Sequence, residues 1–167
     1  MCPLGALLWA LVTITSPGHA LLYQPRLGYQ GHRFSLVKFR SMTADGRRVT
    51  SIGRWLRATA LDELPQLVNI LRGEMSFVGP RPLLATDIEG LSRVPGHVRR
   101  VQMIPGLAGL AQLYGGKHPE PTSRLALDLY YAHACSFGFD LWIVCRSIVT
   151  SFLGGWEPSA PPRSVLK

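Results

Sequence analysis

LDELPQLVNILRG, residues 61–73, predicts a helix that begins at two adjacent acids. The apolar residues of this stretch recur at the spacing of one helix face, and they are Leu64, Leu67, Val68 and Leu71. A proline is tolerated only in the first turn of a helix, so Pro65 requires the helix to start near Asp62. Gly73 ends the helix. Asp62 and Glu63 are therefore expected at the helix start.

Two acids in this place have an ordinary explanation, because Asp and Glu favour the start of a helix. Nearby basic residues favour a catalytic explanation instead. These residues are Lys38 and Arg40 at the end of a predicted strand, Arg57, and Arg81 between two prolines. Cations keep a carboxylate ionised, and guanidinium groups bind phosphate bidentately. The pattern therefore indicates a phosphate-handling site in which Asp62 attacks phosphorus and Glu63 holds Mg²⁺.

Composition narrows the function classes. The chain has 167 residues, room for one domain, and 47% of them are hydrophobic, which excludes disorder. Its net charge is +8, and residues 26–57 alone hold eight basic residues and one acidic residue. This charge points to nucleic acid, acidic lipid or a phosphorylated substrate. The sequence contains no P-loop, GxGxxG, HExxH or GxSxG motif, and its three cysteines and five histidines show neither disulfide nor zinc spacing.

The N-terminal run of residues 3–15 is apolar and uncharged. About 12 helical residues reach only ~18 Å, too short for a bilayer core of ~30 Å. Three interpretations remain open from this run alone: a signal peptide with a cleavage site at residues 18–20, a helix that enters or lies on a membrane, and an ordinary core helix.

Further elements follow from periodicity and turn residues. Strands are expected at 21–24 and 34–39 with a hairpin turn at 28–31, a short helix at 50–57, a helix at 83–100 broken near Pro95, helices at 121–134 and 140–152, and loops at 79–82 and 105–109. The apolar face of the last helix is expected either to rest on lipid or to pack in the core. These elements predict an α+β fold that is mainly helical, with a short antiparallel β element.

Several blocks in this order resemble the bacterial sugar transferase family, the monotopic polyprenyl-phosphate phosphoglycosyl transferases. They are KFRSM at 38–42, RATALDELPQL at 57–67, NILRGEMSFVGPRP at 69–82, PGLAGLAQ at 105–112, and DLYY at 128–131 followed by Ser136 and Asp140. The resemblance covers about residues 3–152.

The resemblance implies transfer of a sugar 1-phosphate from a UDP-sugar to undecaprenyl phosphate, with release of UMP. It implies that Asp62 forms a phosphosugar-aspartyl intermediate and that Glu63 binds Mg²⁺. The expected substrate contacts are Lys38, Arg40, Arg57, Arg81 and Gln112. It places the protein at the cytoplasmic face of the bacterial inner membrane, as a peripheral or monotopic protein on anionic lipid. Nucleic acid is not an expected partner, and the sugar and the oligomeric state stay open.

Family members begin with a re-entrant helix broken at a Ser-Pro, and this chain begins about where that break falls. Residues 1–20 are therefore expected to form a partial, half re-entrant membrane-associated helix, residues 21–153 the catalytic domain with interfacial amphipathic helices, and residues 154–167 a flexible tail. The alternative function is an inactive membrane-associated scaffold or a truncated fragment of such a transferase.

Overall fold

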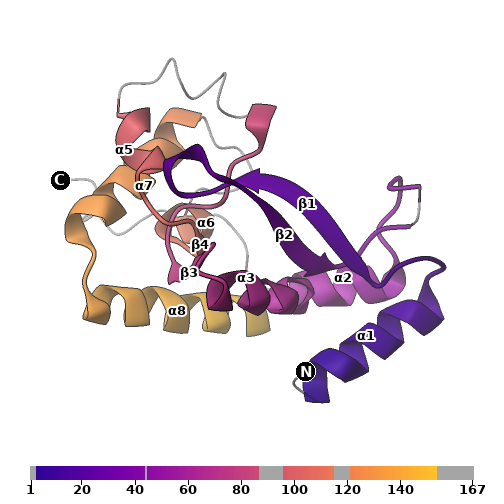
Figure 1. The fold of residues 1–167 in the computed structure, drawn as a ribbon. Helices are drawn as coiled ribbons and strands as arrows, with labels where there is room; N and C mark the ends of the chain where they lie inside the picture. The colour runs from indigo at the N-terminus through magenta and orange to yellow at the C-terminus, as the bar shows by residue number, and fades with distance from the viewer. Residues whose placement is uncertain (1–2, 44, 87–95, 115–120, 154–167) are drawn as a thin grey trace.

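A twisted β-hairpin organises the part of the chain that carries the acids. The structure is a computed structural model that describes residues 3–43, 45–86, 96–114 and 121–153. Strands β1 (Leu21–Leu27) and β2 (Arg33–Phe39) pair antiparallel through the 3₁₀ turn η1 (Tyr29–Gly31), as Figure 1 shows. The predicted hairpin is confirmed, and its first strand continues past Pro25. A proline is tolerated there because, among the described residues, β2 is the one strand paired with β1, and the further bridge of β1 to Leu83 is made at Leu27, away from Pro25.

A second, parallel pair joins β3 (Ser76–Val78) to β4 (Gly106–Ala108). The sequence predicted a loop at 105–109, and that prediction was wrong for residues 106–108. Glycine explains the pairing: a Cβ on Gly106 would lie 2.0 Å from the amide nitrogen of Gly79. The two backbones can therefore approach this closely only because Gly106 has no side chain.

The helices largely follow the predictions. They are α1 (Pro3–Thr15), α2 (Ser51–Ala58), the 3₁₀ helix η2 (Leu61–Gln66), α3 (Leu67–Leu71), α5 (His97–Val101), α6 (Leu110–Tyr114), α7 (Pro121–Ala134) and α8 (Phe137–Phe152). The helix expected at 62–72 is thus split into η2 and α3, and Gly73 ends it with a φ of 74°. Helix α6 had not been predicted. Helix α8 starts three residues early because the Ser136 hydroxyl accepts a hydrogen bond from the Phe139 amide.

Two predictions fall partly or wholly outside the described residues. The helix expected at 83–100 is described mainly at its end, as α5, because 87–95 lie outside the described residues. The tail at 154–167 also lies outside them.

The predicted apolar stripe of η2 and α3 faces the core only in part, because Leu64 packs against a buried cluster whereas the last apolar positions lie outward. Leu71 is 87% exposed and Val68 42% exposed, whereas Asp62, Gln66 and Asn69 are buried. The side chain of Asn69 accepts a hydrogen bond from the Val37 amide at 3.1 Å and donates one to the Ser35 carbonyl at 2.8 Å. The polar face therefore packs against β2 because it satisfies backbone groups of that strand.

The buried residues form two clusters. One lies among β3, α6, α7 and α8 and contains Val78, Leu110, Ala111, Leu113, Leu127, Tyr131 and Ile143. The other joins α1 to the hairpin and α2, and contains Leu8, Val12, Ala20, Phe39 and Leu56. Helix α1 thus contributes to a core, while its remaining surface exposes Leu4, Leu7, Trp9 and Ile14.

In the described part of the chain, none of the helices combines the length and the apolarity needed to span a bilayer.

Candidate active site

Asp62 and Glu63 lie in the first turn of η2, which packs against β2. The chain enters this turn through Ala60, whose φ of 55° is left-handed, and the Glu63 amide donates to the Ala60 carbonyl at 3.1 Å. The residue Asp62 is only 7% exposed, whereas the side chain of Glu63 is 25% exposed. The two neighbouring carboxylates therefore differ in access to solvent.

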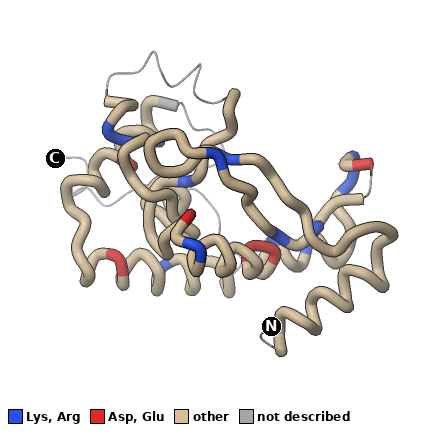
Figure 2. The backbone as a smooth tube through the Cα atoms, viewed as in Figure 1, with Lys and Arg blue, Asp and Glu red and all other residues tan. Residues whose placement is uncertain are grey.

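Basic groups from three elements surround the acids, and Figure 2 shows basic positions of the hairpin near the acidic positions of η2. Burial raises the pKa of the Asp62 carboxyl, while the positive charges of Lys38 and Arg57 oppose that rise. Burial also lowers the pKa of Lys38, and the negative charge of Asp62 opposes this shift. Asp62 and Lys38 therefore each favour the charged form of the other.

Arg57 lies in the last turn of α2, and a buried hydroxyl orients it. Its Nε donates to the Ser41 hydroxyl at 2.7 Å. Helix α2 can approach Ser41 because Gly53 has no side chain: a Cβ there would lie 1.9 Å from the Ser41 carbonyl oxygen. The hydrogen bond uses the Nε group and leaves both terminal nitrogens of Arg57 without a described partner. These nitrogens are suited to an anionic ligand.

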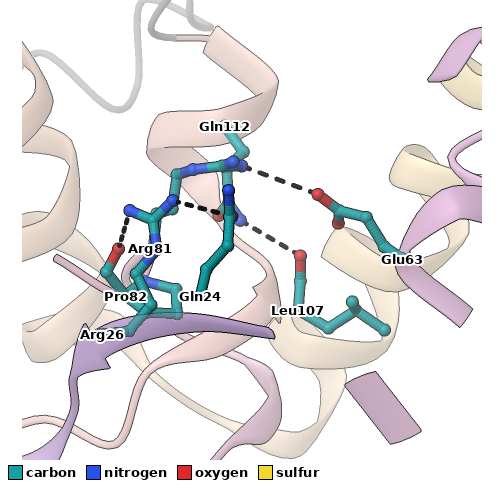
Figure 3. A network of polar contacts seen from close by, with 7 residues as sticks. All are labelled: Gln24, Arg26, Glu63, Arg81, Pro82, Leu107 and Gln112. Carbon is teal, nitrogen blue, oxygen red and sulfur yellow. Dashed lines mark hydrogen bonds and ion pairs between the residues drawn. The ribbon is translucent and has the colours of Figure 1, made fainter. Parts of the chain in front are cut away.

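Arg81 faces Glu63 from the loop that follows β3. Its Nη1 lies 3.8 Å from Oε1 of Glu63, and its side chain is 50% exposed. Burial raises the pKa of Glu63, while the charge of Arg81 lowers it and that of Asp62 raises it further. In Figure 3 Arg81 and Glu63 face one another beside Gln112, whose Nε2 donates to the Leu107 carbonyl at 3.1 Å.

A small pocket, open to solvent, lies between these groups. Charged or polar side chains that line it are Arg26, Glu63, Gln66, Arg81 and Gln112. Gln112 places its Oε1, which is buried and has no hydrogen-bond partner, next to this pocket. The pocket is thus lined by three charged groups and two amides, and it can receive a polar, anionic ligand.

The structure brings together six of the seven predicted site residues, and separates one. Asp62, Glu63, Lys38, Arg57 and Arg81 influence one another electrostatically, and Gln112 lies beside them in the pocket. Arg40 instead donates from Nη2 to the carbonyls of Ser16 at 2.7 Å and Gly18 at 3.1 Å. Its guanidinium therefore holds the end of α1 against the hairpin.

Arg26 is a site residue that the sequence analysis missed. Its Nη1 lies 3.5 Å from the Pro82 carbonyl and its Nη2 donates to Oε1 of Gln24 at 3.3 Å, and its charge lowers the pKa of Glu63 (Figure 3). A signal for it existed in the hairpin pattern. Gln24 and Arg26 pair with Leu36 and Phe34, so they share a sheet face with Lys38.

The donor set fits Mg²⁺ when it is combined with substrate oxygens. No cluster of three or more His, Cys, Asp or Glu able to hold a metal exists among the described residues. Mg²⁺ does not need one, because proteins usually hold it by one or two carboxylates together with phosphate oxygens and water. Asp62 and Glu63 supply two hard carboxylates beside a pocket suited to phosphate.

Comparison with known proteins identifies relatives of this chain. The family model described as Bacterial sugar transferase matches residues 1–154. A UDP-glucose:undecaprenyl-phosphate glucose-1-phosphate transferase of Caulobacter vibrioides is 42% identical over 87% of this chain. A protein of the same name from Escherichia coli is 36% identical over 85% of the chain. A UDP-N-acetylgalactosamine-undecaprenyl-phosphate N-acetylgalactosaminephosphotransferase of Aeromonas hydrophila is 32% identical over 86% of the chain.

This chain spans only part of these relatives: 61% of the Caulobacter protein, 34% of the Escherichia protein and 38% of the Aeromonas protein. The aligned part includes the whole predicted site, since the family model extends over residues 1–154. The match thus covers the hairpin, the acids of η2 and the loop of Arg81 alike, and the chain belongs to the bacterial sugar transferase family.

Proposed function

We propose that this protein transfers a sugar 1-phosphate from a UDP-sugar to a polyprenyl phosphate such as undecaprenyl phosphate, and releases UMP. The observation that carries the proposal is a buried carboxylate, Asp62, next to Lys38 and Arg57 and one residue from a pocket lined by Glu63 and Arg81. The names of the relatives support the donor and the acceptor, because each names undecaprenyl phosphate and a UDP-sugar.

In the first step, an oxygen of the ionised Asp62 carboxylate attacks the phosphorus that carries the sugar. A bond forms between this oxygen and phosphorus, the bond from phosphorus to the bridging oxygen breaks, and UMP departs with the electron pair. In the second step, an oxygen of the polyprenyl phosphate attacks the same phosphorus. The bond to Asp62 breaks, and the carboxylate is restored without gain or loss of a proton.

The cations have two tasks in this scheme. Lys38 and Arg57 oppose the rise that burial imposes on the pKa of Asp62, and so keep the nucleophile ionised. Arg81 and Arg26 line the pocket on the side of Glu63, where guanidinium groups can bind the diphosphate oxygens. Positive groups fixed in advance stabilise the charge that develops on the transferred phosphoryl group.

Asp62 and Glu63 are the residues that would hold Mg²⁺, with Glu63 as the main ligand. When bound, the ion supplies charge neutralisation at the phosphate oxygens. Glu63 has a second task that needs no metal, because its carboxylate lies 3.8 Å from Arg81 and keeps that guanidinium on the pocket side.

We also propose that the protein works at the membrane surface, on the cytoplasmic face of the inner membrane, where a polyprenyl phosphate presents its head group. Helix α8 exposes an apolar stripe made of Phe137, Leu141, Ile148 and Phe152. In Figure 1, α8, α3 and α2 run along the same lower edge of the molecule, and Leu71 of α3 and Trp55 of α2 are also exposed. Anionic lipid suits the basic segment at 26–57.

The inactive scaffold is not favoured. A scaffold would need the exposed apolar faces of α1 and α8, but it would not need a buried acid among cations. Burial of Asp62 and Lys38 costs desolvation energy. Charged groups buried at such a cost are typical of functional sites, which favours a catalytic role.

The test is release of UMP by the detergent-solubilised protein, with undecaprenyl phosphate, Mg²⁺ and a panel of UDP-sugars that begins with UDP-glucose. Release is expected to require the lipid and the metal, and to fall by about 10³-fold or more in Asp62→Asn. Asp45→Asn is the matched control, because Asp45 is exposed and, within the described part of the chain, its hydrogen bonds join it to Thr43 and Arg47 of its own loop. Release that survives Asp62→Asn, or folded protein that accepts no UDP-sugar, contradicts the proposal.

A further inference from the structure

The DLYY block at 128–131 has no part in the chemistry proposed above, yet two of its side chains are buried. Asp128 is 2% exposed and Tyr131 7% exposed. They stand three residues apart on α7, so they lie on one face of that helix. Each makes a polar contact that leads toward the loop of Arg81.

Asp128 holds a single guanidinium in place. Its Oδ2 accepts a hydrogen bond from Nε of Arg100 at 2.6 Å, and the side chains are 3% and 10% exposed. The same guanidinium donates from Nη2 to the Arg81 carbonyl at 3.0 Å. Arg100 therefore connects α7 to the loop that carries Arg81. Its single planar guanidinium bonds Asp128 of α7 and the Arg81 carbonyl of the loop.

Tyr131 supports the start of the same loop. Its hydroxyl donates to Oδ1 of Asp140 at 2.8 Å and lies 3.5 Å from the carbonyl of Val78. Val78 is the last residue of β3, immediately before residues 79–82. Helix α7 is thus linked to this loop in two places, at Arg81 through Arg100 and at Val78, the residue before the loop, through Tyr131.

The loop leaves Arg81 few conformations. Pro80 and Pro82 have fixed φ values, and a residue that precedes proline is driven to extended backbone. The Gly106 amide donates to the Pro80 carbonyl at 2.9 Å, and the Gly79 amide donates to Ala108 at 2.9 Å. The remaining freedom is rotation of the peptide unit between residues 81 and 82. The hydrogen bond from Arg100 to the Arg81 carbonyl restricts that rotation, and so fixes the direction in which the Arg81 side chain leaves the backbone.

We propose that Arg100, held by Asp128, is a positioning residue that sets the Arg81 guanidinium for the diphosphate of the donor. This role rests on the proposed function, because it concerns the same site. Arginine is required here, since only its planar fork presents Nε to Asp128 and Nη2 to Arg81 at once. A lysine has one nitrogen and cannot span both acceptors, although it keeps the charge that Asp128 needs.

The test is a double-mutant cycle on sugar-phosphate transfer from radiolabelled UDP-glucose, with Arg100→Lys and Arg81→Ala made singly and together. Displacement of a substrate-binding group by ~1 Å can cost up to ~100-fold, so Arg100→Lys is expected to lower kcat/KM about 10-fold. In the Arg81→Ala background the same change is expected to cost less than about 2-fold, because the group that Arg100 positions is gone.

Arg99→Lys is the matched control. Arg99 is the preceding residue of α5 and also reaches α7, where its Nη1 lies 2.7 Å from Nε2 of His133, but it does not contact the loop of Arg81. This control is expected to leave kcat/KM unchanged within about 2-fold, as a surface contact does. If Arg100→Lys does not fold, Arg100→Gln with Asp128→Asn removes both buried charges together and replaces it in the cycle.

The outcomes separate the two proposals. A wild-type protein that transfers no sugar phosphate overturns the proposed function, and this role with it. An active wild type in which Arg100→Lys costs the same factor with and without Arg81, or costs nothing, overturns the positioning role alone.

Discussion

Asp62 is a buried acid, and the proposed reaction requires it to be charged. Burial raises its pKa, and Lys38 and Arg57 oppose this effect from β2 and α2. A carboxylate that has lost part of its hydration shell is freer to approach phosphorus than one in bulk water. The cations that preserve its charge also lie where an anionic substrate must arrive. In the proposed reaction, the same positive groups thus keep the nucleophile ionised and attract the anionic substrate.

In the proposed mechanism Glu63 is the main Mg²⁺ ligand and Asp62 is the nucleophile, so a change at Glu63 tests the metal requirement by itself. Glu63→Gln keeps the size of the side chain and removes the charge, so the Mg²⁺ concentration for half-maximal activity is expected to rise about 10-fold or more. The measurement is a Mg²⁺ titration of transfer activity, with Asp45→Asn as the control that removes an exposed acid far from η2 in the chain. An unchanged titration curve would show that Glu63 is not a metal ligand.

Asn69 is the residue that fixes η2 and α3 on the hairpin. It is fully buried, and its side chain contacts the Val37 amide, the Ser35 carbonyl and Oε2 of Glu74. Asn69→Ala leaves these groups without their partner, and the free energy of unfolding is expected to fall by about 2–3 kcal/mol in denaturant titrations. Val68→Ala, at the exposed neighbouring position, is expected to change it by less than about 0.5 kcal/mol. Equal effects of the two changes would contradict this account.

At the residue scale, the sequence predicted the acids and three of the cations because type and spacing were sufficient. Arg40 shows what spacing cannot predict. It lies two residues from Lys38, but its guanidinium turns to the carbonyls that end α1. Arg26 shows the reverse case, since a residue 37 positions before Glu63 joins the site through the register of the hairpin.

At the scale of elements, α8 has two faces that differ in exposure. Ile143 is fully buried in the core cluster, whereas Phe137 is 85% exposed and Phe152 81% exposed. Of the two expectations for this helix, core packing is confirmed for the face of Ile143. The opposite stripe is about half exposed at Leu141 and Ile148 and mostly exposed at Phe137 and Phe152, and contact with lipid is its proposed use.

The double variant Phe137→Glu with Phe152→Glu is expected to lower the partition coefficient onto vesicles that contain anionic lipid by at least about 10-fold. Its unfolding temperature is expected to stay unchanged, because both side chains are exposed. The measurement is co-sedimentation with vesicles of phosphatidylethanolamine and phosphatidylglycerol.

The matched control for α8 carries the same added charge on exposed apolar positions elsewhere. Tyr29→Glu with Val98→Glu alters η1 and α5, where these residues are 44% and 58% exposed. Figure 1 shows α5 at the edge of the molecule opposite α8. If both double variants weaken vesicle binding equally, charge repulsion explains the loss and the stripe of α8 has no special role.

Periodicity identified the helix expected at 62–72 but assigned its faces correctly only in part, since Leu64 packs against a buried cluster and the later apolar positions do not. The apolar residues Val68 and Leu71 lie outward, and the polar side chains of Gln66 and Asn69 lie inward. An apolar stripe predicts a core face only when apolar surface is what the helix packs against. Here the partner is the backbone of β2, together with a charged site, so polar groups are the ones that must be buried.

At the scale of the whole molecule, the α+β class and the hairpin were predictable because local signals specify them. The parallel pair of β3 and β4 was not, since its strands are short and lie about 30 residues apart in the chain. This pair matters for the site. Backbone hydrogen bonds join the loop of Arg81 to β4, and the glycines at 79 and 106 allow the two backbones to approach closely.

The distribution of charge is also a property of the whole chain. Eight of its 18 basic residues lie in residues 26–57, which form most of the hairpin and α2. Both proposed substrates and the proposed membrane are anionic. A positive field over this segment therefore favours their arrival in the neighbourhood of η2.

The central claim is that Asp62 forms a covalent bond to the sugar phosphate. The most direct measurement is mass spectrometry of the acid-quenched protein after incubation with UDP-glucose and Mg²⁺, in the absence of polyprenyl phosphate. The account predicts an adduct of one hexose phosphate on the peptide that contains Asp62, an equal amount of released UMP, and neither product in Asp62→Asn. Transfer to lipid without any such adduct, or an adduct that persists in Asp62→Asn, would contradict it.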